Sequence, residues 1–282
     1  MNNWDDLFSH IRADRQLGAT QLYAQTLNVL KKAAATGAVT SRADIGDVVR
    51  SIHATQPAMA PFHFLAQKLS NLPDDSAGAF DPAQAVLALI TELDRNHQLS
   101  VERIATQFER LQLKPKSVLL HSSSGTVREL VRQSLDSGTT IFVSECRPDM
   151  EGLSLAGELV IEGFTVKTFV DDARAEIMKD VDLIILGSDW VSERDFTNKI
   201  GTYTLALAAR ELGKHIYVAA DNTKFAHSSF RPDPKKIIRH FESFYQDLLF
   251  EQTPNSLVTS FVTDSAVLSP QEVGFHFETA RV

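Results

Sequence analysis

The first 110 residues carry a helical pattern of hydrophobic positions. Apolar side chains recur at spacings of three and four, and the pattern ends near Gly37, with members at Leu17, Ala19, Leu22, Tyr23, Leu27 and Leu30. Further helices are predicted over 42–53 and 60–70. A long helix is predicted over 82–109, either continuous or broken near Asn96–Leu99. The stretch 71–82, rich in proline and aspartate, is predicted to be a loop.

From Ser117 onward the pattern changes to that of short strands. Five β-rich runs occur, with helical segments between them, at 117–121, 139–145, 164–170, 181–187 and 214–220. The run VDLIIL at 181–186 is apolar apart from Asp182, as expected of a strand buried on both faces. The tail over 244–264 is predicted to hold one more helix and a strand.

Strands that alternate with helices are typical of βαβ units around a parallel sheet. The sequence therefore predicts an α/β protein in two parts. An N-terminal helical domain covers residues 1–110, and a Rossmann-like parallel-sheet domain covers 111–282, with the boundary near 110–116.

The composition is that of an ordinary globular protein, with 43% hydrophobic and 23% charged residues. A net charge of −8 argues against broad binding to nucleic acid or to anionic membranes. No apolar run approaches the roughly 18–20 residues of a membrane span, and the N-terminus lacks the pattern of a secretory signal. The single cysteine, Cys146, excludes an internal disulfide and fits a reducing compartment. We expect a cytoplasmic protein without a direct nucleic-acid or membrane partner.

The segment GSDWVSERDFTNKIGTY at 187–203 follows the buried strand and precedes a helix-forming run at 205–213, so it is predicted to be a strand-to-helix loop. Such loops line the ligand crevice of an open parallel sheet. Asp189 lies at the strand tip, where burial would raise its pKa and suit it to proton transfer; alternatively it caps the loop. Lys199 is a candidate phosphate contact and Asn198 a candidate hydroxyl or phosphate donor. The alternative is that both are solvated residues of a helix first turn.

A second loop, His121 to Thr126, carries three serines and Gly125 between a strand and a helix. Small residues at a helix start let backbone N–H groups approach a phosphate, which makes Ser123 and Gly125 candidate binding residues. A plain serine N-cap uses the same residues.

Two further strand ends carry charge. Arg147 is a candidate phosphate clamp, or it pairs with Glu145 or Asp149. Cys146 is expected to be a small buried side chain rather than a reactive thiol. The stretch 171–174 is expected to be a helix cap followed by a surface charge.

The sequence offers no evidence for a metal or a cofactor. The nine histidines are scattered, and no metal-ligand spacing, P-loop, G-x-G-x-x-G or G-x-S-x-G motif occurs. We predict neither a metal nor a cofactor.

Four motifs together resemble a known family. They are N-K-I-G-T-Y at 198–203 with G-S-D at 187–189, E-C-R-P at 145–148 followed by Gly152, Y-V-A-A at 217–220 with T-K-F at 223–225, and F-E-Q-T-P at 250–254 followed by L-V-T at 257–259. The chain resembles the family of the translation initiation factor 2B alpha, beta and delta subunits. That family also contains methylthioribose-1-phosphate isomerase and ribose-1,5-bisphosphate isomerase. The resemblance covers nearly all of residues 110–264.

The resemblance implies a sugar-phosphate pocket between the two domains and a homodimer or higher homo-oligomer formed through the C-terminal domain. In the isomerases, a cysteine in an H-C-N-x-G loop and the aspartate of G-A-D move protons between C1 and C2 of an aldose 1-phosphate. By position, Asp189 matches that aspartate, Asn198 and Lys199 match substrate-binding residues, and Arg147 lies in the loop near the substrate.

This chain also departs from the isomerase pattern. Ser122 stands at the position of the catalytic cysteine, and a hydroxyl is a far weaker acid than a thiol. Gln56 replaces the arginine of T-R-P-T, and Arg15-Gln16-Leu17-Gly18-Ala19 only approximates the R-G-A loop. Glu193-Arg194-Asp195 replaces an N-G-D sequence.

Three functions remain open on the sequence. The first is a factor-2B-like protein that binds a phosphorylated sugar or a nucleotide without cysteine-dependent catalysis. The second is an aldose–ketose isomerase that uses Asp189 with another partner, such as Cys146 or His121. The third is an assembly subunit with a vestigial pocket. Whether the protein is an enzyme is undecided by the residues alone.

Overall fold

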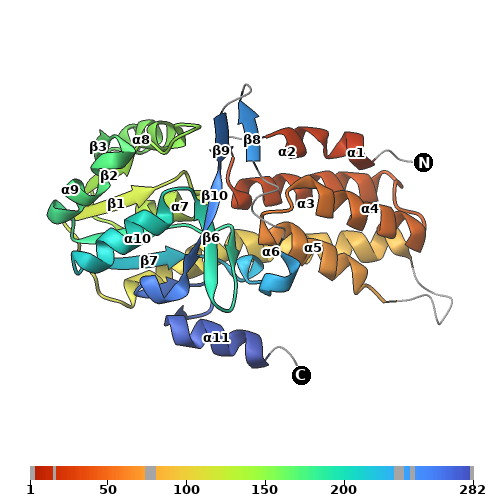
Figure 1. The fold of residues 1–282 in the computed structure, drawn as a ribbon. Helices are drawn as coiled ribbons and strands as arrows, with labels where there is room; N and C mark the ends of the chain where they lie inside the picture. Colours follow the sequence, from red (N-terminus) through yellow and green to blue (C-terminus); the bar gives the residue numbers. More distant parts are fainter. Residues whose placement is uncertain (1–3, 15–16, 74–80, 232–237, 242–244, 280–282) are drawn as a thin grey trace.

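The computed structural model describes residues 4–14, 17–73, 81–231, 238–241 and 245–279. Within them, helices gather on one side of the molecule and a layered sheet on the other (Figure 1). The predicted α/β fold with an N-terminal helical part is confirmed. Most of the loop predicted at 71–82, and residues Arg15 and Gln16, lie outside the described residues.

The helices of the N-terminal domain are α1 (Trp4–Leu7), α2 (Ser9–Ala13), α3 (Ala19–Ala35), α4 (Arg42–Thr55), α5 (Ala60–Ser70) and α6 (Pro82–Glu109). From α3 onward the helices follow the predicted order, and the two short helices α1 and α2 before them were not predicted. Local capping explains two of the starts. Ser41 and Asp44 form a capping box before α4, and Asp81 accepts the N–H of Gln84 at the start of α6. The alternative of a break near Asn96–Leu99 is wrong, because no proline or glycine interrupts the ladder there.

One long helix serves two hydrophobic cores. The N-terminal half of α6 packs with α3, α4 and α5 through Val86, Ile90 and Leu93. Its C-terminal half packs on the sheet through Ile104 and Phe108. The boundary predicted near 110–116 therefore follows a helix that both domains share.

The second domain is built on a seven-stranded sheet of order β12-β11-β7-β4-β1-β2-β3. The strands are β1 (Ser117–His121), β2 (Thr140–Ser144), β3 (Thr165–Phe169), β4 (Leu183–Leu186), β7 (His215–Ala219), β11 (Ser260–Val262) and β12 (Val267–Leu268). Neighbouring strands are parallel except for the β11–β12 pair.

Helices cover both faces of this sheet. With α6, helices α7 (Gly125–Ser134) and α8 (Glu151–Ile161) pack on the face that holds Leu183 and Ile185 of β4. The opposite face holds Ile184 and Leu186, and it is covered by α9 (Arg174–Ile177), α10 (Thr202–Glu211) and α11 (Pro270–Thr279). The central strand is thus buried on both sides, as its unbroken apolar run predicts.

The segment GSDWVSERDFTNKIGTY at 187–203 is not the simple strand-to-helix loop that the sequence predicts. It forms a hairpin of β5 (Trp190–Val191) and β6 (Asp195–Lys199), and β6 pairs with β10 (Phe250–Pro254) in a three-stranded antiparallel sheet. Figure 1 shows β6 and β10 standing between the helical domain and the large sheet. Because the partner strand lies some fifty residues later, the local pattern could not reveal the pairing.

The helix predicted within 244–264 is also wrong. The chain there forms β9 (Tyr245–Leu248), which pairs with β8 (Ile238–Phe241), followed by β10, a 3₁₀ turn over Asn255–Leu257 and β11. Cross-strand pairing overrides the local helical pattern at this point. Among the described residues, no helix has both the length and the apolar character needed to cross a bilayer.

Candidate functional site

A cavity of about 340 Å³ lies where the helical domain meets the carboxyl ends of the parallel strands. Loops that follow β1, β2, β4 and β7 form one wall, and the starts of α3 and α5 form the other. Its chemistry-bearing lining residues are Arg12, Asp14, Gln56, Ser122, Ser123, Ser124, Asp149, Glu151, Ser188, Asp189, Asn198, Lys199 and Lys224. The position matches the crevice expected of an open α/β sheet.

Asp189 joins the two walls. Its carboxylate accepts the backbone N–H of Ala19 at the start of α3, and its carbonyl accepts the N–H of Ala60 at the start of α5, with an N···O distance of 2.9 Å. Desolvation raises the pKa of this carboxyl, and the charges of Lys224 and Lys199 oppose the shift. Asp189 therefore has both properties that the sequence left open, a raised pKa and a capping role, but it caps the other domain.

Lys199 and Asn198 lie on strand β6 rather than in a helix first turn. Lys199 is 5% exposed, and its ammonium contacts two carboxylates, Glu151 at 3.0 Å and Asp149 at 3.4 Å. Asn198 also lines the cavity, and its Nδ2 donates to Thr202 Oγ1 at 3.1 Å. The buried ion pairs fix Lys199 against the first residue of α8.

Glu151 is a cavity residue that the sequence analysis missed. It is 7% exposed, and burial raises its pKa while Lys199 lowers it. Ser122 Oγ donates to its Oε1 at 3.3 Å. Only its place directly before Gly152 in the E-C-R-P segment could have drawn attention to it.

The loop after β1 places Ser122, Ser123 and Gly125 in the cavity lining. Ser122 has a φ of +75°, in the left-handed region that few side chains favour. Its N–H donates to Cys146 Sγ at 3.0 Å. Ser124 caps α7 by accepting the N–H of Val127 at 3.4 Å, so the N-cap role is also real.

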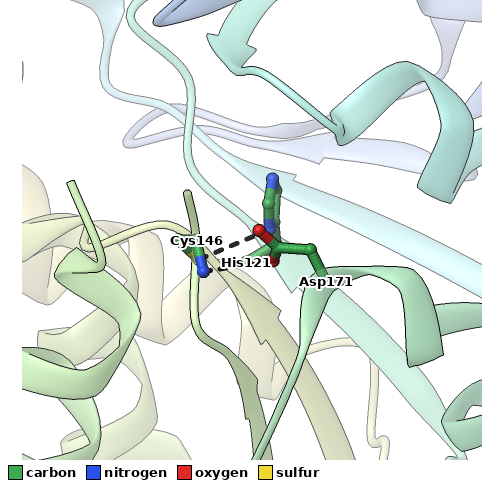
Figure 2. A group of neighbouring side chains, drawn as sticks. All are labelled: His121, Cys146 and Asp171. Carbon is green, nitrogen blue, oxygen red and sulfur yellow. Dashed lines mark hydrogen bonds between the residues drawn. The ribbon is translucent and has the colours of Figure 1, made fainter. Parts of the chain in front are cut away.

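His121, Cys146 and Asp171 converge behind this loop (Figure 2). Cys146 Sγ lies 3.4 Å from His121 Nδ1, which also bonds Ser144 Oγ at 2.8 Å, and His121 Nε2 bonds the carbonyl of Ile200 at 3.0 Å. The side chains of His121 and Cys146 are buried, and neither lines the cavity. Burial raises the pKa of Cys146 to about 11 and lowers that of His121 to about 4, so both groups are neutral near pH 7.

The same three groups fit a metal poorly. Asp171 accepts the N–H groups of Cys146 and Arg147 at 3.1 and 2.8 Å and pairs with Arg174 at 3.1 Å. A cation would have to displace these donors next to a buried guanidinium. The group instead holds the Ser122 loop in its strained position. The geometry also removes Cys146 and His121 as direct partners of Asp189 in catalysis.

Arg147 lies away from the cavity. Its side chain is 66% exposed, and its Nε is 3.6 Å from Glu145 Oε1. The surface ion pair, one of the alternatives drawn from the sequence, is the contact that the structure has. Arg147 is therefore not placed to clamp a phosphate in this cavity.

Lys224 is a buried cation in the cavity lining, unlike Arg147. It lies in the 3₁₀ turn after β7, is 2% exposed and lines the cavity. Its charge is the largest electrostatic influence that lowers the pKa of Asp189. Lys224 belongs to the T-K-F motif at 223–225, which the sequence analysis used only as part of the family resemblance and not as a site.

Besides α8, whose first residue is Glu151, three other helices begin at the cavity. Gly18 and Ala19 start α3, Met59 is the N-cap of α5, and Gly125 starts α7. Gly18 and Met59 provide no side-chain cap. Because helix N-termini present N–H groups and a partial positive charge, their convergence favours an anion.

The comparisons with known proteins agree with this architecture. The model of the initiation factor 2 subunit family matches residues 15–270. The chain belongs to this family. Members of two kinds match it at similar identity, so membership alone does not choose between a translation factor and an isomerase.

One relative is the translation initiation factor eIF-2B subunit 2-like protein of Pyrococcus horikoshii. It is 30% identical to this chain over 159 residues, which cover 54% of this chain and 58% of that protein. The methylthioribose-1-phosphate isomerase of Heliobacterium modesticaldum is 33% identical over 202 residues, covering 61% of this chain and 57% of that protein. The chain thus matches less than two thirds of the length of these curated relatives.

The solved structures show the same fold. The crystal structure of translation initiation factor eIF-2B from Pyrococcus horikoshii OT3 aligns with a TM-score of 0.82 and 22% identity. The alignment covers 96% of this chain and 98% of that chain.

Two departures from the isomerase pattern have different structural meanings in this family member. The Gln56 side chain lines the cavity, but its Nε2 donates to the carbonyls of Ile11 and Asp14 at 2.9 and 3.4 Å. It therefore supports the backbone where an arginine would bring charge.

The second departure, Glu193 to Asp195, lies outside the cavity lining. Glu193 accepts the N–H of Ser228 at 3.1 Å, and Asp195 pairs with Arg231. This stretch fastens the segment after β7, so its altered charges do not change the pocket.

Proposed function

We propose that this initiation factor 2 family member binds a phosphorylated sugar or a nucleotide in the cavity between its domains, without cysteine-dependent isomerisation. The observation that carries the proposal is the convergence of three helix N-termini and two buried lysines on one cavity. Anions bind where N–H groups and the helix dipole point at them. The carboxylate of Asp189 and the amide of Asn198 offer partners for sugar hydroxyls.

The absence of a reactive thiol from the cavity wall supports a binding role. Ser122 occupies the position of the family cysteine, and its hydroxyl touches only the Glu151 carboxyl among the described side chains. A hydroxyl gives up its proton far less readily than a thiol. Cys146 lies behind the loop and is fully buried.

One observation favours a second candidate, an aldose–ketose isomerase that uses Asp189. The pKa of the Asp189 carboxyl is raised, as a general acid or base near neutral pH requires. Such an enzyme would need a second proton-transfer group, and Ser122 is poorly suited to that task.

Turnover and thermal shift, measured together, distinguish the candidates. The protein is incubated with methylthioribose 1-phosphate, ribose 1,5-bisphosphate and nucleoside monophosphates, while ketose formation and the melting temperature are followed. A raised melting temperature without turnover is the expected result, since a ligand of the native state adds stability by mass action. A ketose product that disappears in Asp189→Asn would establish the isomerase. No shift with any ligand would leave only the role of an assembly subunit.

We also propose that the chain forms a homo-oligomer through its sheet domain. Helix α8 supports this, because Val160 and Ile161 on it are 55% and 88% exposed. Contiguous exposed apolar side chains are typical of association surfaces. Sedimentation of the wild type and of Ile161→Glu tests the proposal: the variant should shift toward the monomer.

A further inference from the structure

We infer that Glu151 is a specificity-determining residue of the cavity, and that one oxygen of its carboxylate, Oε2, accepts a hydrogen bond from a hydroxyl of the bound ligand. The inference rests on the proposed function, because it concerns the same cavity. It narrows the ligand from an anion in general to a phosphorylated sugar or nucleotide that presents a hydroxyl to the start of α8. It also gives Glu151 a role beyond that of an ion-pair partner for Lys199.

The two oxygens of the Glu151 carboxylate have different surroundings. Oε1 accepts the Ser122 hydroxyl at 3.3 Å and lies 3.0 Å from the Lys199 ammonium. Oε2 is buried and has no hydrogen-bond partner among the residues that the structure describes. Within that part of the chain, it is the one buried carboxylate oxygen of which this is true. A buried polar atom without a partner is costly, so a donor that reached Oε2 would be bound favourably.

Glu151 lies where a ligand supplies such a donor. The residue is 7% exposed, and it lines the cavity together with Ser122, Asn198 and Lys199. A sugar hydroxyl has a proton to donate, whereas an ionised oxygen only accepts hydrogen bonds. An ionised phosphate oxygen at this place would also be repelled by the carboxylate. The free oxygen of Glu151 therefore favours the hydroxyl-bearing part of the ligand over its phosphate.

The backbone fixes the position of this carboxylate. Glu151 is the first residue of α8, and Gly152 follows it. A Cβ at position 152 would lie 1.9 Å from the carbonyl oxygen of Ser144, so the start of α8 lies directly against the end of β2. A side chain held in this way loses little further freedom when a ligand binds. Glu151 is thus preorganised for recognition.

The charge of the carboxylate sets the size of the effect. Burial raises the pKa of Glu151, while the Lys199 ammonium opposes the shift and favours the ionised form. The N-terminus of α8 favours a negative charge at the same place. A hydrogen bond from a hydroxyl to an ionised group changes an affinity by roughly ten- to a hundredfold.

The test compares the dissociation constants of ribose 5-phosphate and inorganic phosphate, measured by calorimetry at pH 7.5. Both probes carry a phosphate, and only the first carries sugar hydroxyls. The wild type should bind ribose 5-phosphate at least about tenfold more tightly. Glu151→Gln should reduce this preference by about tenfold. Its amide oxygen stays with the donors Ser122 and Lys199, so a neutral NH₂ group replaces the charged acceptor on the ligand side.

Glu151→Asp is the second variant. It keeps the negative charge but shortens the side chain by one methylene, so the preference for ribose 5-phosphate should fall again although the charge of the site is unchanged. Either variant alone provides the test if the other does not fold. Glu158→Gln is the matched control. It removes a negative charge from the same helix, but Glu158 pairs with Arg128 outside the cavity lining, so the preference should stay as in the wild type.

The ratio of the two dissociation constants separates recognition from support of the fold. A purely structural Glu151 would change the affinities for both probes by the same factor, and an unchanged ratio in the variants would overturn the inference while the proposed function stands. If the wild type binds neither probe, the proposed function fails, and the inference fails with it.

Discussion

The thiol of Cys146 provides the sharpest test of where the chemistry of this fold resides. If the catalytic cysteine had simply moved from position 122 to position 146, the thiol would be reactive in the folded protein. The structure places it behind the Ser122 loop, fully buried and bonded by the Ser122 N–H. We therefore predict that Cys146 is inert in the native state and reacts only when the chain opens.

The magnitude follows from the pKa and the burial. Burial raises the pKa of the thiol from 9.0 to about 11, so the thiolate fraction at pH 8 falls about a hundredfold. The full burial of the side chain adds a second barrier, since the reagent must wait for local unfolding. Together they should slow modification by more than about a hundredfold relative to a free thiol.

The assay follows modification by a chromogenic disulfide reagent at pH 8, in buffer and in denaturing urea. The double variant Ser122→Cys with Cys146→Ser moves the one thiol to the cavity wall and should react within the mixing time. Wild-type modification at a similar rate in buffer and in urea would refute the reasoning and would return Cys146 to the list of candidate catalysts.

The free energy of unfolding provides an independent test of the hydrogen bond from the Ser122 N–H to Cys146 Sγ. Cys146→Ala removes the acceptor of the buried Ser122 N–H and should lower the free energy of unfolding by about 1–3 kcal/mol. Cys146→Ser retains an acceptor, so it should lose less. Equal effects of the two variants would mean that the hydrogen bond does not hold the loop.

Three further predictions concern other parts of the fold. Trp190 donates through Nε1 to the carbonyl of Ala226 at 2.7 Å, so Trp190→Phe should lower the free energy of unfolding in urea by about 1–3 kcal/mol, whereas the exposed Tyr203→Phe should change nothing. The pKa of His121 is lowered from 6.5 to about 4, so the unfolded chain binds a proton that the folded chain excludes, and stability should fall as the pH drops from 6.5 toward 4, by up to roughly 3 kcal/mol. A His121→Asn variant should lose this component of the pH dependence; an unchanged profile would contradict the assignment. Lys224→Met should abolish the thermal shift caused by inorganic phosphate at millimolar concentration, and a retained shift would place the anion elsewhere in the molecule.

The elements that the sequence predicts best are those whose signals are local. The helix over 60–70 and the long helix over 82–109 match α5 and α6 residue for residue, and 117–121 matches β1. Both helices carry apolar periodicity and a proline in the first turn, α6 also has a capping aspartate directly before it, and β1 is a short run of mostly apolar residues. These elements can therefore be predicted from the local sequence alone.

The elements that it mispredicts depend on distant partners. Residues 195–199 pair with the distant strand Phe250–Pro254 as well as with the nearby β5, and β10 in the tail is a strand through the same distant pairing. The stretch Glu193–Asp195 looked like a change in the pocket, yet its partners Ser228 and Arg231 hold it outside the cavity lining. Pairing energy comes from cross-strand contacts, which a local pattern does not contain.

The sequence by itself determined the fold class, the edge of the sheet where a site would form, and the presence of Asp189, Asn198, Lys199 and the serine loop at that edge. These follow from local periodicity and from the rule that parallel strands end together. Only the tertiary structure decided which charges meet. It brought Lys224 and the starts of α3 and α5 to Asp189, neutralised Lys199 with Glu151, and left Arg147 on the surface. Electrostatic interactions fall with distance in space rather than along the chain, so the character of the pocket is set by contacts between segments far apart in sequence.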